Sequence, residues 1–174
     1  YMSFAQLRHN QPVPKSRIAT TIPYSDYEFY GKLLSKPFFY VYDDLGSRRK
    51  VSAQDVWAYV SNEQLYINHN QKFNLVAYVG SLSHFLSEKR IYREYTGQFY
   101  YDYTMNRNMP VSVTTETTEY ILSLETGDIN EYNVRTVATA LMGDPELHDE
   151  YMQLSRKERE QMKFFYMRKY NKRN

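Results

Sequence analysis

The stretch of this chain that comes nearest to a nucleophile motif is Gly80-Ser-Leu-Ser83-His84. A hydrolase of the nucleophile-elbow type places its serine between two glycines, in the pattern G-x-S-x-G, and here the second glycine is absent. Ser83 and His84 are also neighbours in a stretch that we expect to be a strand, so their side chains point to opposite faces of a sheet. The pattern therefore does not predict a serine–histidine pair.

Metal and cofactor sites have as little support. The histidines are isolated from one another, without the i, i+4 pair or H-x-H pattern that favours zinc, and the chain has no cysteine. The pair Asp43-Asp44 is explained by a hairpin turn, and six scattered glycines do not form a phosphate-binding loop. We therefore expect no metal and no cofactor. The four histidines are His9, His69, His84 and His148.

Carboxylates among aromatic residues leave one enzymatic alternative open. Glycoside hydrolysis needs two carboxyl groups that are close in space, whatever their spacing in sequence. The available residues are Glu94, Asp102, Glu116 and Glu119. Acidic side chains are mostly solvated, so we expect these to be exposed on strand faces. A hydrolase that acts on polysaccharide or peptide is the alternative function.

Aromatic rings are the most unusual resource of the chain, since 19 Tyr, 9 Phe and one Trp make up 17% of it. Tyrosine is common in sheets that have one partly solvent-exposed face, where the ring is buried and the hydroxyl is hydrated. Period-two spacing puts alternate rings of residues 92–103 on one face, where they could stack on sugar rings or on extended peptide. The plainer interpretation is that they border the core. The predicted ligand-binding face is Tyr95, Phe99, Tyr101 and Tyr103.

Residues 161–170 are expected to form a helix with apolar side chains around more than one stripe. Such a helix is buried on two sides, docks a partner, or lies at a membrane interface. Packing on its own sheet is the plain interpretation, because packing stabilises most helices. The predicted docking residues, for a partner or for a second copy of the chain, are Phe164, Phe165, Met167 and Tyr170.

The charge distribution argues for pairing within the chain. The net charge is +2, which is too small to indicate a nucleic-acid partner. Residues 155–174 hold eight Lys or Arg and two Glu, a net charge of +6, and the preceding 144–154 hold four acidic residues and no Lys or Arg. We expect these neighbouring segments to pair with each other. No apolar run reaches the roughly 20 residues of a membrane span.

The elements that must position these residues are strands followed by helices. Three prolines favour an extended arm over residues 1–23, and a capping-box pattern at Ser25 predicts a short helix over 25–34. Strands are predicted at 38–43, 47–51, 56–60, 65–67, 73–79, 82–86, 91–95 and 98–103. Residues 111–118 pair at a sheet edge or remain loose. A hairpin with Gly127 in its turn follows over 120–132.

The last part of the chain predicts three capped helices. Asn133 begins the first, Asp144-Pro145 begins the second, and the capping box Ser155-Arg-Lys-Glu158 begins the third. We therefore predict a single α+β domain over 1–174, with an arm (1–23), a β-rich body (24–132) and a helical tail (133–174). The body is a bent antiparallel sheet or a partly closed barrel, on which the tail packs.

Several of these segments together resemble a group of exported proteins of Bacteroides-like bacteria that have no assigned activity. The resemblance runs from about residue 24 onward. It implies export through a removed signal peptide and implies no catalytic residue. The motifs that carry it are Tyr24-Ser-Asp-Tyr-Glu-Phe29, Val51-Ser-Ala-Gln-Asp-Val-Trp57 with Leu65-Tyr-Ile67, the strand 80–85, Leu124-Glu-Thr-Gly-Asp-Ile-Asn-Glu-Tyr132, Gly143-Asp-Pro-Glu-Leu147 and Lys169-Tyr-Asn171.

The sequence therefore favours a non-catalytic binding or scaffolding module of the cell envelope over an enzyme. The chain begins with Tyr1 and not with Met, which indicates that a preceding segment was removed. An exported mature protein and an excised domain both fit this start. The expected partners are a glycan, a peptide or another envelope protein, at a periplasmic or cell-surface location.

Overall fold

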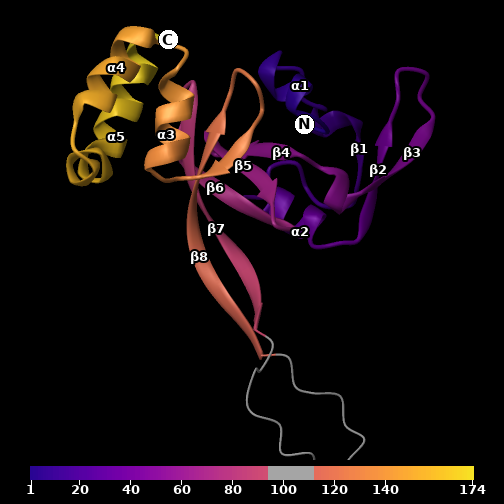
Figure 1. Ribbon diagram of the computed structural model, residues 1–174. Coiled ribbons are helices and arrows are strands. Elements are labelled where there is room, and N and C mark those ends of the chain that lie inside the picture. The colour runs from indigo at the N-terminus through magenta and orange to yellow at the C-terminus, as the bar shows by residue number, and fades with distance from the viewer. Residues whose placement is uncertain (94–111) are drawn as a thin grey trace, which may run out of the picture.

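The computed structural model describes residues 1–93 and 112–174 and shows an α+β protein with two antiparallel sheets. The first sheet has three strands in the order β1-β2-β3, and the second has six in the order β4-β5-β6-β7-β8-β9. Neither sheet closes into a barrel. Figure 1 shows the three-stranded sheet on one side of the six-stranded sheet and the C-terminal helices on the other. The predicted α+β class with a helical tail is confirmed.

The N-terminal region is more structured than the prolines suggest. Residues 1–23, expected as an extended arm, contain a short helix and an edge strand, because tertiary contacts hold them: the Tyr1 ammonium donates to the carbonyl oxygen of Ala58 at 2.9 Å. The first sheet consists of β1 (Ile18–Ala19), β2 (Phe38–Tyr42) and β3 (Arg48–Ser52). The helices of this region are α1 (Phe4–Arg8) and α2 (Phe29–Leu34).

The predicted capping box at Ser25 is wrong, because α2 begins at Phe29. The Asp26 carboxylate accepts from the backbone N–H of Glu28 at 2.8 Å and from Lys32 Nζ. An aspartate that bonds its own backbone two residues on forms a turn, and this turn delays the start of the helix. The lysine hydrogen bond, followed by the Glu28 N–H, lowers the pKa of Asp26.

The six-stranded sheet is a meander of sequential neighbours. A single helical turn at Ala53–Asp55 leads into it. Its first hairpins agree with the predicted strands. The strands are β4 (Ala58–Ser61), β5 (Gln64–His69), β6 (Lys72–Tyr78), β7 (Leu82–Arg93), β8 (Ser112–Ser123) and β9 (Ile129–Glu131).

The β7–β8 pair differs most from the prediction. Residues 82–86 and 91–93, expected in two strands, lie in one strand, and residues 112–118, expected to be an edge or loose, pair with it throughout. The register runs from Leu82 opposite Ser123 to Arg93 opposite Ser112. The outer part of this ribbon projects away from the body (Figure 1). Both faces of this outer part are therefore exposed to solvent. Its sequence lacks the alternation of apolar and polar residues that identifies a half-buried strand.

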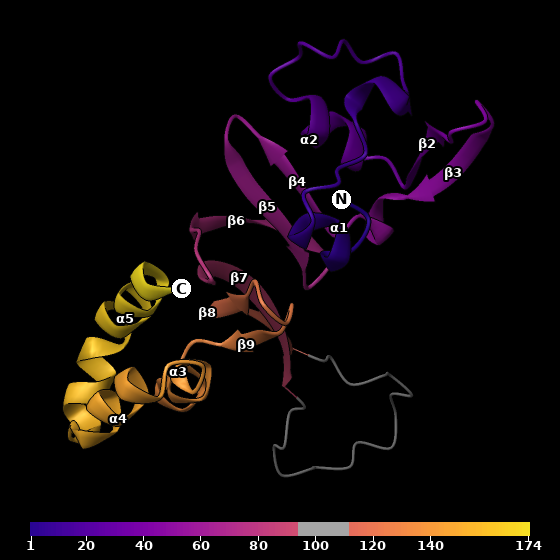
Figure 2. The same cartoon turned by 90° about the horizontal axis from the view of Figure 1, so that it is seen from above.

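The tail agrees with the prediction almost residue for residue. Its helices are α3 (Val134–Leu141), α4 (Pro145–Gln153) and α5 (Arg156–Arg173). Asn133 and Ser155 each form a capping box, and Asp144 caps α4 with proline at the first helical position. In Figure 2 the three helices stand together beside β7, β8 and β9. None of the described helices is both long and apolar enough to span a membrane.

Three buried clusters hold these layers together. One lies under α2 in the three-stranded sheet and includes Phe29 and Leu33. A second lies in the six-stranded sheet around Phe85 and Ile67, both fully buried. The third joins the tail to β7 and β8 and contains Leu82, Ile121, Val137, Leu141, Leu147, Tyr151, Tyr166, Met167 and Tyr170.

The predicted pairing between acidic and basic segments is confirmed. Lys169 Nζ pairs with Glu150, and Arg173 Nη1 lies 3.1 Å from both Asp144 and Glu146. The Lys169 hydrogen bond is the main reason that the pKa of Glu150 is lowered. These pairs lie near the surface, where solvent weakens an ion pair. Together they align α5 with α4.

Candidate functional site

The structure tests only part of the predicted aromatic site. Tyr95, Phe99, Tyr101 and Tyr103 lie outside the described residues, as do Glu94 and Asp102. The ligand-binding face that these rings were predicted to form therefore stays a prediction. Of the four candidate carboxylates, Glu116 and Glu119 are described, and both are exposed on β8.

Aromatic residues do form a stack elsewhere. Tyr30 of α2, Tyr59 of β4 and Tyr66 of β5 lie in a row, with ring centroids 4.9 Å and 4.8 Å apart. All three rings are half-buried, and burial raises the pKa of Tyr30 and of Tyr59. Because the row connects α2 to the six-stranded sheet, its role is to join the two sheets.

The four predicted docking residues of α5 separate into two pairs. Met167 is fully buried and Tyr170 is 6% exposed, both inside the tail's own core, whereas Phe164 and Phe165 are 42% and 52% exposed. The Phe164 ring packs against Tyr78 with a centroid distance of 5.5 Å. The second apolar side of α5 therefore covers the sheet in part, and docking of a partner stays a prediction for Phe164 and Phe165.

Ser83 and His84 point in different directions, as expected for neighbours in a strand. Ser83 is buried, and its Oγ donates to the carbonyl oxygen of Gly80 at 2.8 Å. The His84 ring packs against Tyr132 at 5.0 Å. Burial is the largest influence on His84 and lowers its pKa. Both side chains are packing groups in this structure.

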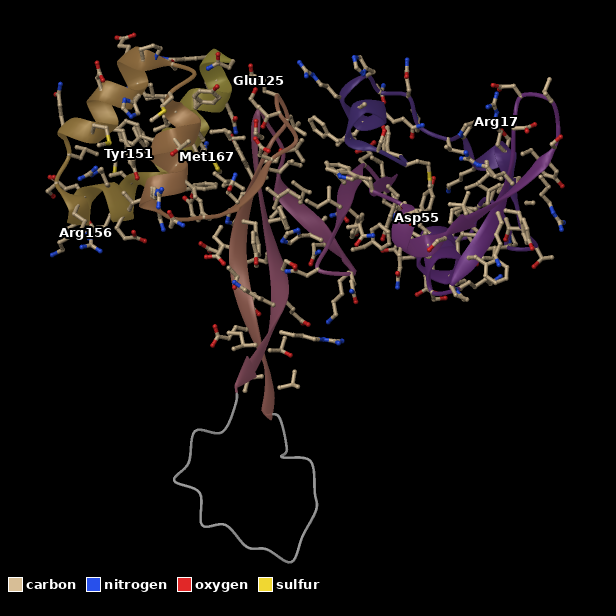
Figure 3. The ribbon with its side chains drawn as sticks, turned by 45° about the vertical axis from the view of Figure 1, so that its right-hand side comes forward. Arg17, Asp55, Glu125, Tyr151, Arg156 and Met167 are labelled. Carbon is tan, nitrogen blue, oxygen red and sulfur yellow. The ribbon has the colours of Figure 1, made fainter. Side chains whose placement is uncertain are left out.

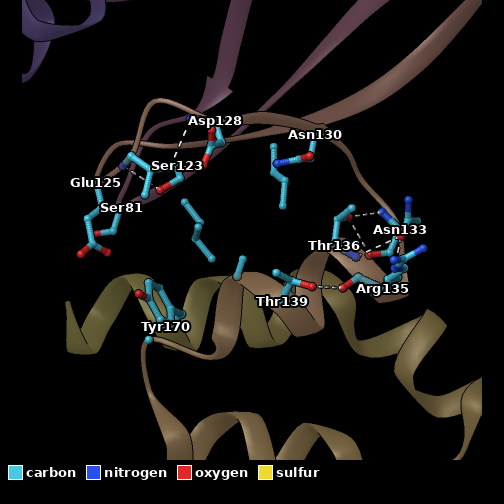
Figure 4. A pocket seen from close by; sticks show the side chains of 15 residues that line it. Ser81, Ser123, Glu125, Asp128, Asn130, Asn133, Arg135, Thr136, Thr139 and Tyr170 are labelled. Atoms are coloured by element: carbon cyan, nitrogen blue, oxygen red, sulfur yellow. Dashed lines mark hydrogen bonds between the residues drawn. The ribbon is translucent and has the colours of Figure 1, made fainter.

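A cavity with polar and apolar lining lies between the β8–β9 hairpin and α3, with a volume of about 580 Å³ (Figure 4). We call it the hairpin–helix pocket. Buried Leu82 and Ile121 form its floor. Its other lining residues come from the β6–β7 turn, the hairpin, α3 and α5, and include Ser81, Ser123, Glu125, Thr126, Asp128, Asn130, Asn133, Arg135, Thr136, Thr139 and Tyr170.

Local backbone chemistry fixes the two walls of the pocket. On the hairpin side, Ser123 Oγ accepts from the N–H of Thr126, and Thr126 Oγ1 donates to Asp128 at 2.7 Å. On the helix side, Asn133 Oδ1 accepts from the N–H groups of Arg135 and Thr136, both at 3.0 Å. These bonds hold the turn and the helix start in place without using all the polar groups that line the cavity.

The turn itself depends on Gly127. Its φ is +85°, and a Cβ at this position would lie 2.6 Å from the ring of Phe4. Phe4 belongs to α1 and also packs against Trp57 at 5.5 Å. The N-terminal helix therefore supports the hairpin from the side away from the pocket, and only glycine allows this approach.

We expect Gly127→Ala to lower the free energy of unfolding by about 1–2 kcal/mol, because alanine is strained at positive φ and its methyl group would displace Phe4. Urea unfolding followed by circular dichroism measures this change. Gly31→Ala is the matched control, since no atom lies within 4 Å of that Cβ position. In the interior of α2 it should stabilise by up to about 1 kcal/mol. Equal effects of the two substitutions would contradict the account.

Several polar groups in the pocket are free to bind a ligand. Within the described part of the chain, no hydrogen bond is formed by the side chains of Ser81, Glu125 and Asn130. Asp128 uses one carboxylate oxygen for Thr126. The pocket thus presents hydroxyl, amide and carboxylate groups side by side, which together donate to and accept from a ligand.

Tyr170 supplies an aromatic ring at one end of the pocket, opposite Arg135 (Figure 4). The ring fits there because residue 143 is glycine: a Cβ at Gly143 would lie 2.5 Å from the Tyr170 hydroxyl oxygen. Burial is the main cause that raises the pKa of Tyr170, and Glu125 and Asp144 add to it. The hydroxyl group therefore stays protonated at neutral pH.

The carboxylates of the pocket are placed for binding. Glu125 and Asp128 are both exposed, whereas a general acid needs an apolar environment to stay protonated at neutral pH. In residues 1–93 and 112–174, no three metal-ligating side chains gather into a group. The arrangement can form many hydrogen bonds, and it shows no proton-transfer pair.

The sequence pointed to Tyr170 and to the 120–132 hairpin, but the other pocket residues were not foreseen. A signal was present: Ser123, Asp128 and Asn130 are polar positions of a predicted hairpin that directly precedes a capped helix. Comparison of the chain with known protein families, with curated proteins and with solved structures finds no match.

Proposed function

We propose that this protein is a non-catalytic binding module that holds a glycan in the hairpin–helix pocket. The observation that carries the proposal is the lining: unpaired hydroxyl, amide and carboxylate groups surround an apolar floor, with the Tyr170 ring at one end. Sugars present ring faces that are apolar and edges of hydroxyl groups that both donate and accept. A pocket with an aromatic ring and mixed hydrogen-bonding groups complements both features.

The size of the pocket supports a small ligand. Its volume of about 580 Å³ lies within the range of roughly 300–1,000 Å³ that is usual for ligand sites. The exposed positions of Glu125 and Asp128 leave room for the ligand to extend into solvent. A terminal sugar unit, or a short section of a longer chain, fits this geometry better than a fully enclosed metabolite.

We include the predicted cell-envelope location in this proposal. A glycan-binding module is of use where polysaccharide is found, and the resemblance to exported proteins favours that location. Cell fractionation with an antibody against the protein tests this part separately. Recovery in the cytoplasmic fraction alone would contradict export and leave the pocket to be tested by binding.

The binding proposal predicts that Glu125→Gln and Asn130→Ala each weaken glycan affinity by roughly tenfold. Glu125→Gln removes the charge that strengthens a hydrogen bond to the ligand, and bonds to charged groups contribute about 1.5–3 kcal/mol. Asn130→Ala removes a neutral amide hydrogen bond, which contributes about 0.5–1.5 kcal/mol. A glycan array identifies ligands, and isothermal titration calorimetry then measures affinity. Asp55→Asn is the control, because Asp55 is an exposed carboxylate on another part of the chain.

Two results would contradict this assignment. One is an array on which no glycan binds. The other is a glycan whose affinity stays unchanged in both Glu125→Gln and Asn130→Ala. If product sugars accumulate when the protein is incubated with a bound oligosaccharide, and Glu125→Gln abolishes them, the hydrolase alternative replaces the binding proposal.

A further inference from the structure

A second cavity lies on the other side of α3, where this helix faces the junction of α4 and α5. Its volume is about 610 Å³. We call it the arginine groove, because Arg135 of α3 and Arg156 and Arg159 of α5 line it together with Met142 and Met152. Figure 3 shows Arg156 at the start of α5, at the far end of the helical tail from Glu125.

The charges of the tail are divided between its two sides. Arg173 forms ion pairs with Asp144 and Glu146, and Lys169 forms one with Glu150. The arginines of the groove form no ion pair with any residue in the described ranges. Glu160 borders the groove but pairs with Lys163. The groove therefore presents a concentrated positive charge that the chain itself does not neutralise.

Arg159 shows this lack of partners at the level of atoms. Its Nη1 lies 3.3 Å from the sulfur of Met152, and a thioether is a weak acceptor. Its Nε is buried and has no hydrogen-bond partner among the described residues. A guanidinium group normally pairs with carboxylate through two parallel bonds. A carboxylate in the groove would supply the acceptor that this side chain lacks.

The groove also exposes apolar surface. Met142 is 61% exposed and Met152 is 44% exposed. Methionine side chains are flexible and polarisable, which makes them suited to surfaces that adapt to an apolar side chain of a partner. Half-buried Val134 and Ala138 of α3 continue this surface. The combination is a Met-lined floor with arginines around it.

We propose that the arginine groove binds an acidic peptide segment of a partner protein. Carboxylates of that segment pair with Arg156 and Arg159, and a large apolar side chain lies between Met142 and Met152. The charge complementarity commits the site to an acidic partner. Arg135 lines both cavities. The test therefore relies on Arg156 and Arg159, which do not line the hairpin–helix pocket.

The probe is a fluorescein-labelled peptide of about 14 residues, roughly four helical turns, built from alternating pairs of Glu and Leu. Fluorescence anisotropy should show saturable binding that weakens as salt is added. We expect Arg156→Glu and Arg159→Gln each to weaken binding by roughly tenfold. Arg168→Glu is the matched control on the same helix, since Arg168 is exposed and lies outside the groove, and it should leave binding within about twofold.

Four results would overturn the proposal: no saturable binding below about 1 mM, equal binding of a peptide with Gln in place of Glu, equal loss in Arg168→Glu, or full competition by inorganic phosphate. The last result would assign a simple anion site. Thermal unfolding of each variant confirms that the fold is intact. Binding of the peptide by Glu125→Gln and Asn130→Ala at wild-type affinity separates this proposal from the proposed glycan binding in the hairpin–helix pocket.

Discussion

Replacement of Tyr151 by alanine should lower the free energy of unfolding by about 3–5 kcal/mol, the usual cost of removing a large buried side chain. Tyr151 is fully buried at the centre of the tail. Its ring lies 5.0 Å from that of Tyr166, and its hydroxyl donates to the carbonyl oxygen of Arg159 at 3.1 Å. The substitution leaves a cavity where α4 packs against α3 and α5. Urea unfolding measures the change.

Two further variants separate the causes of this effect. Tyr151→Phe keeps the ring and removes the hydrogen bond to Arg159, so it should cost only about 1 kcal/mol. Tyr27→Ala makes the same change of residue type at a side chain that is 79% exposed, and should stay within about 0.5 kcal/mol of wild type. If Tyr151→Ala were no more damaging than Tyr27→Ala, the tail core described above would be wrong.

Because α3 forms a wall of both cavities, the tail core also affects function. The pocket and the groove share Asn133, Arg135 and Thr139. These residues lie on one helix whose buried side, Val137 and Leu141, packs in the tail core. Loosening the core by Tyr151→Ala should therefore weaken binding at both sites, whereas Glu125→Gln should affect the pocket alone.

The helical tail could be predicted from the sequence because its signals are local. A cap, an apolar period and a stop occur within each helix, so Asn133, Pro145 and Ser155 mark the starts without reference to the rest of the chain. The elements that were missed are held by distant contacts. β1 depends on pairing with β2, and the Tyr1 ammonium is held by Ala58. The N-terminal helix also has a local cap that was overlooked, because Ser3 Oγ accepts from the N–H of Gln6 in an S-x-x-Q pattern.

The long β7–β8 ribbon was missed for a related reason. Its inner residues, such as Phe85 and Leu122, are apolar and buried. Its outer residues, such as Glu88 and Thr115, face solvent on both sides, so hydrophobic period no longer identifies a strand. The pocket could not be predicted as a whole, because β7, β9, α3 and α5 meet there only after the meander and the tail have packed together.

Asn171 makes a polar contact between the tail and the sheet, beside the buried cluster that joins them. Its Oδ1 accepts from the backbone N–H of Leu82, and its Nδ2 donates to the carbonyl oxygen of the same residue, both at 2.7 Å. The amide thus continues the hydrogen-bonding edge of β7. The approach requires glycine at residue 80, where a Cβ would lie 2.4 Å from Asn171 Nδ2. Residues 80–82 and the C-terminal Asn171, which are far apart in sequence, therefore meet in space.

Replacement of Asn171 by alanine should lower the free energy of unfolding by about 2–4 kcal/mol, because it leaves both backbone groups of Leu82 without partners and each costs about 1–3 kcal/mol. Asn171→Asp should also destabilise, since a carboxylate cannot donate to the Leu82 carbonyl. Hydrogen exchange at the Leu82 amide and urea unfolding measure the two consequences. Asn174→Ala, at the end of the same helix, should change stability by less than about 0.5 kcal/mol. A Leu82 amide that exchanges as slowly in Asn171→Ala as in the wild type would contradict this role of Asn171.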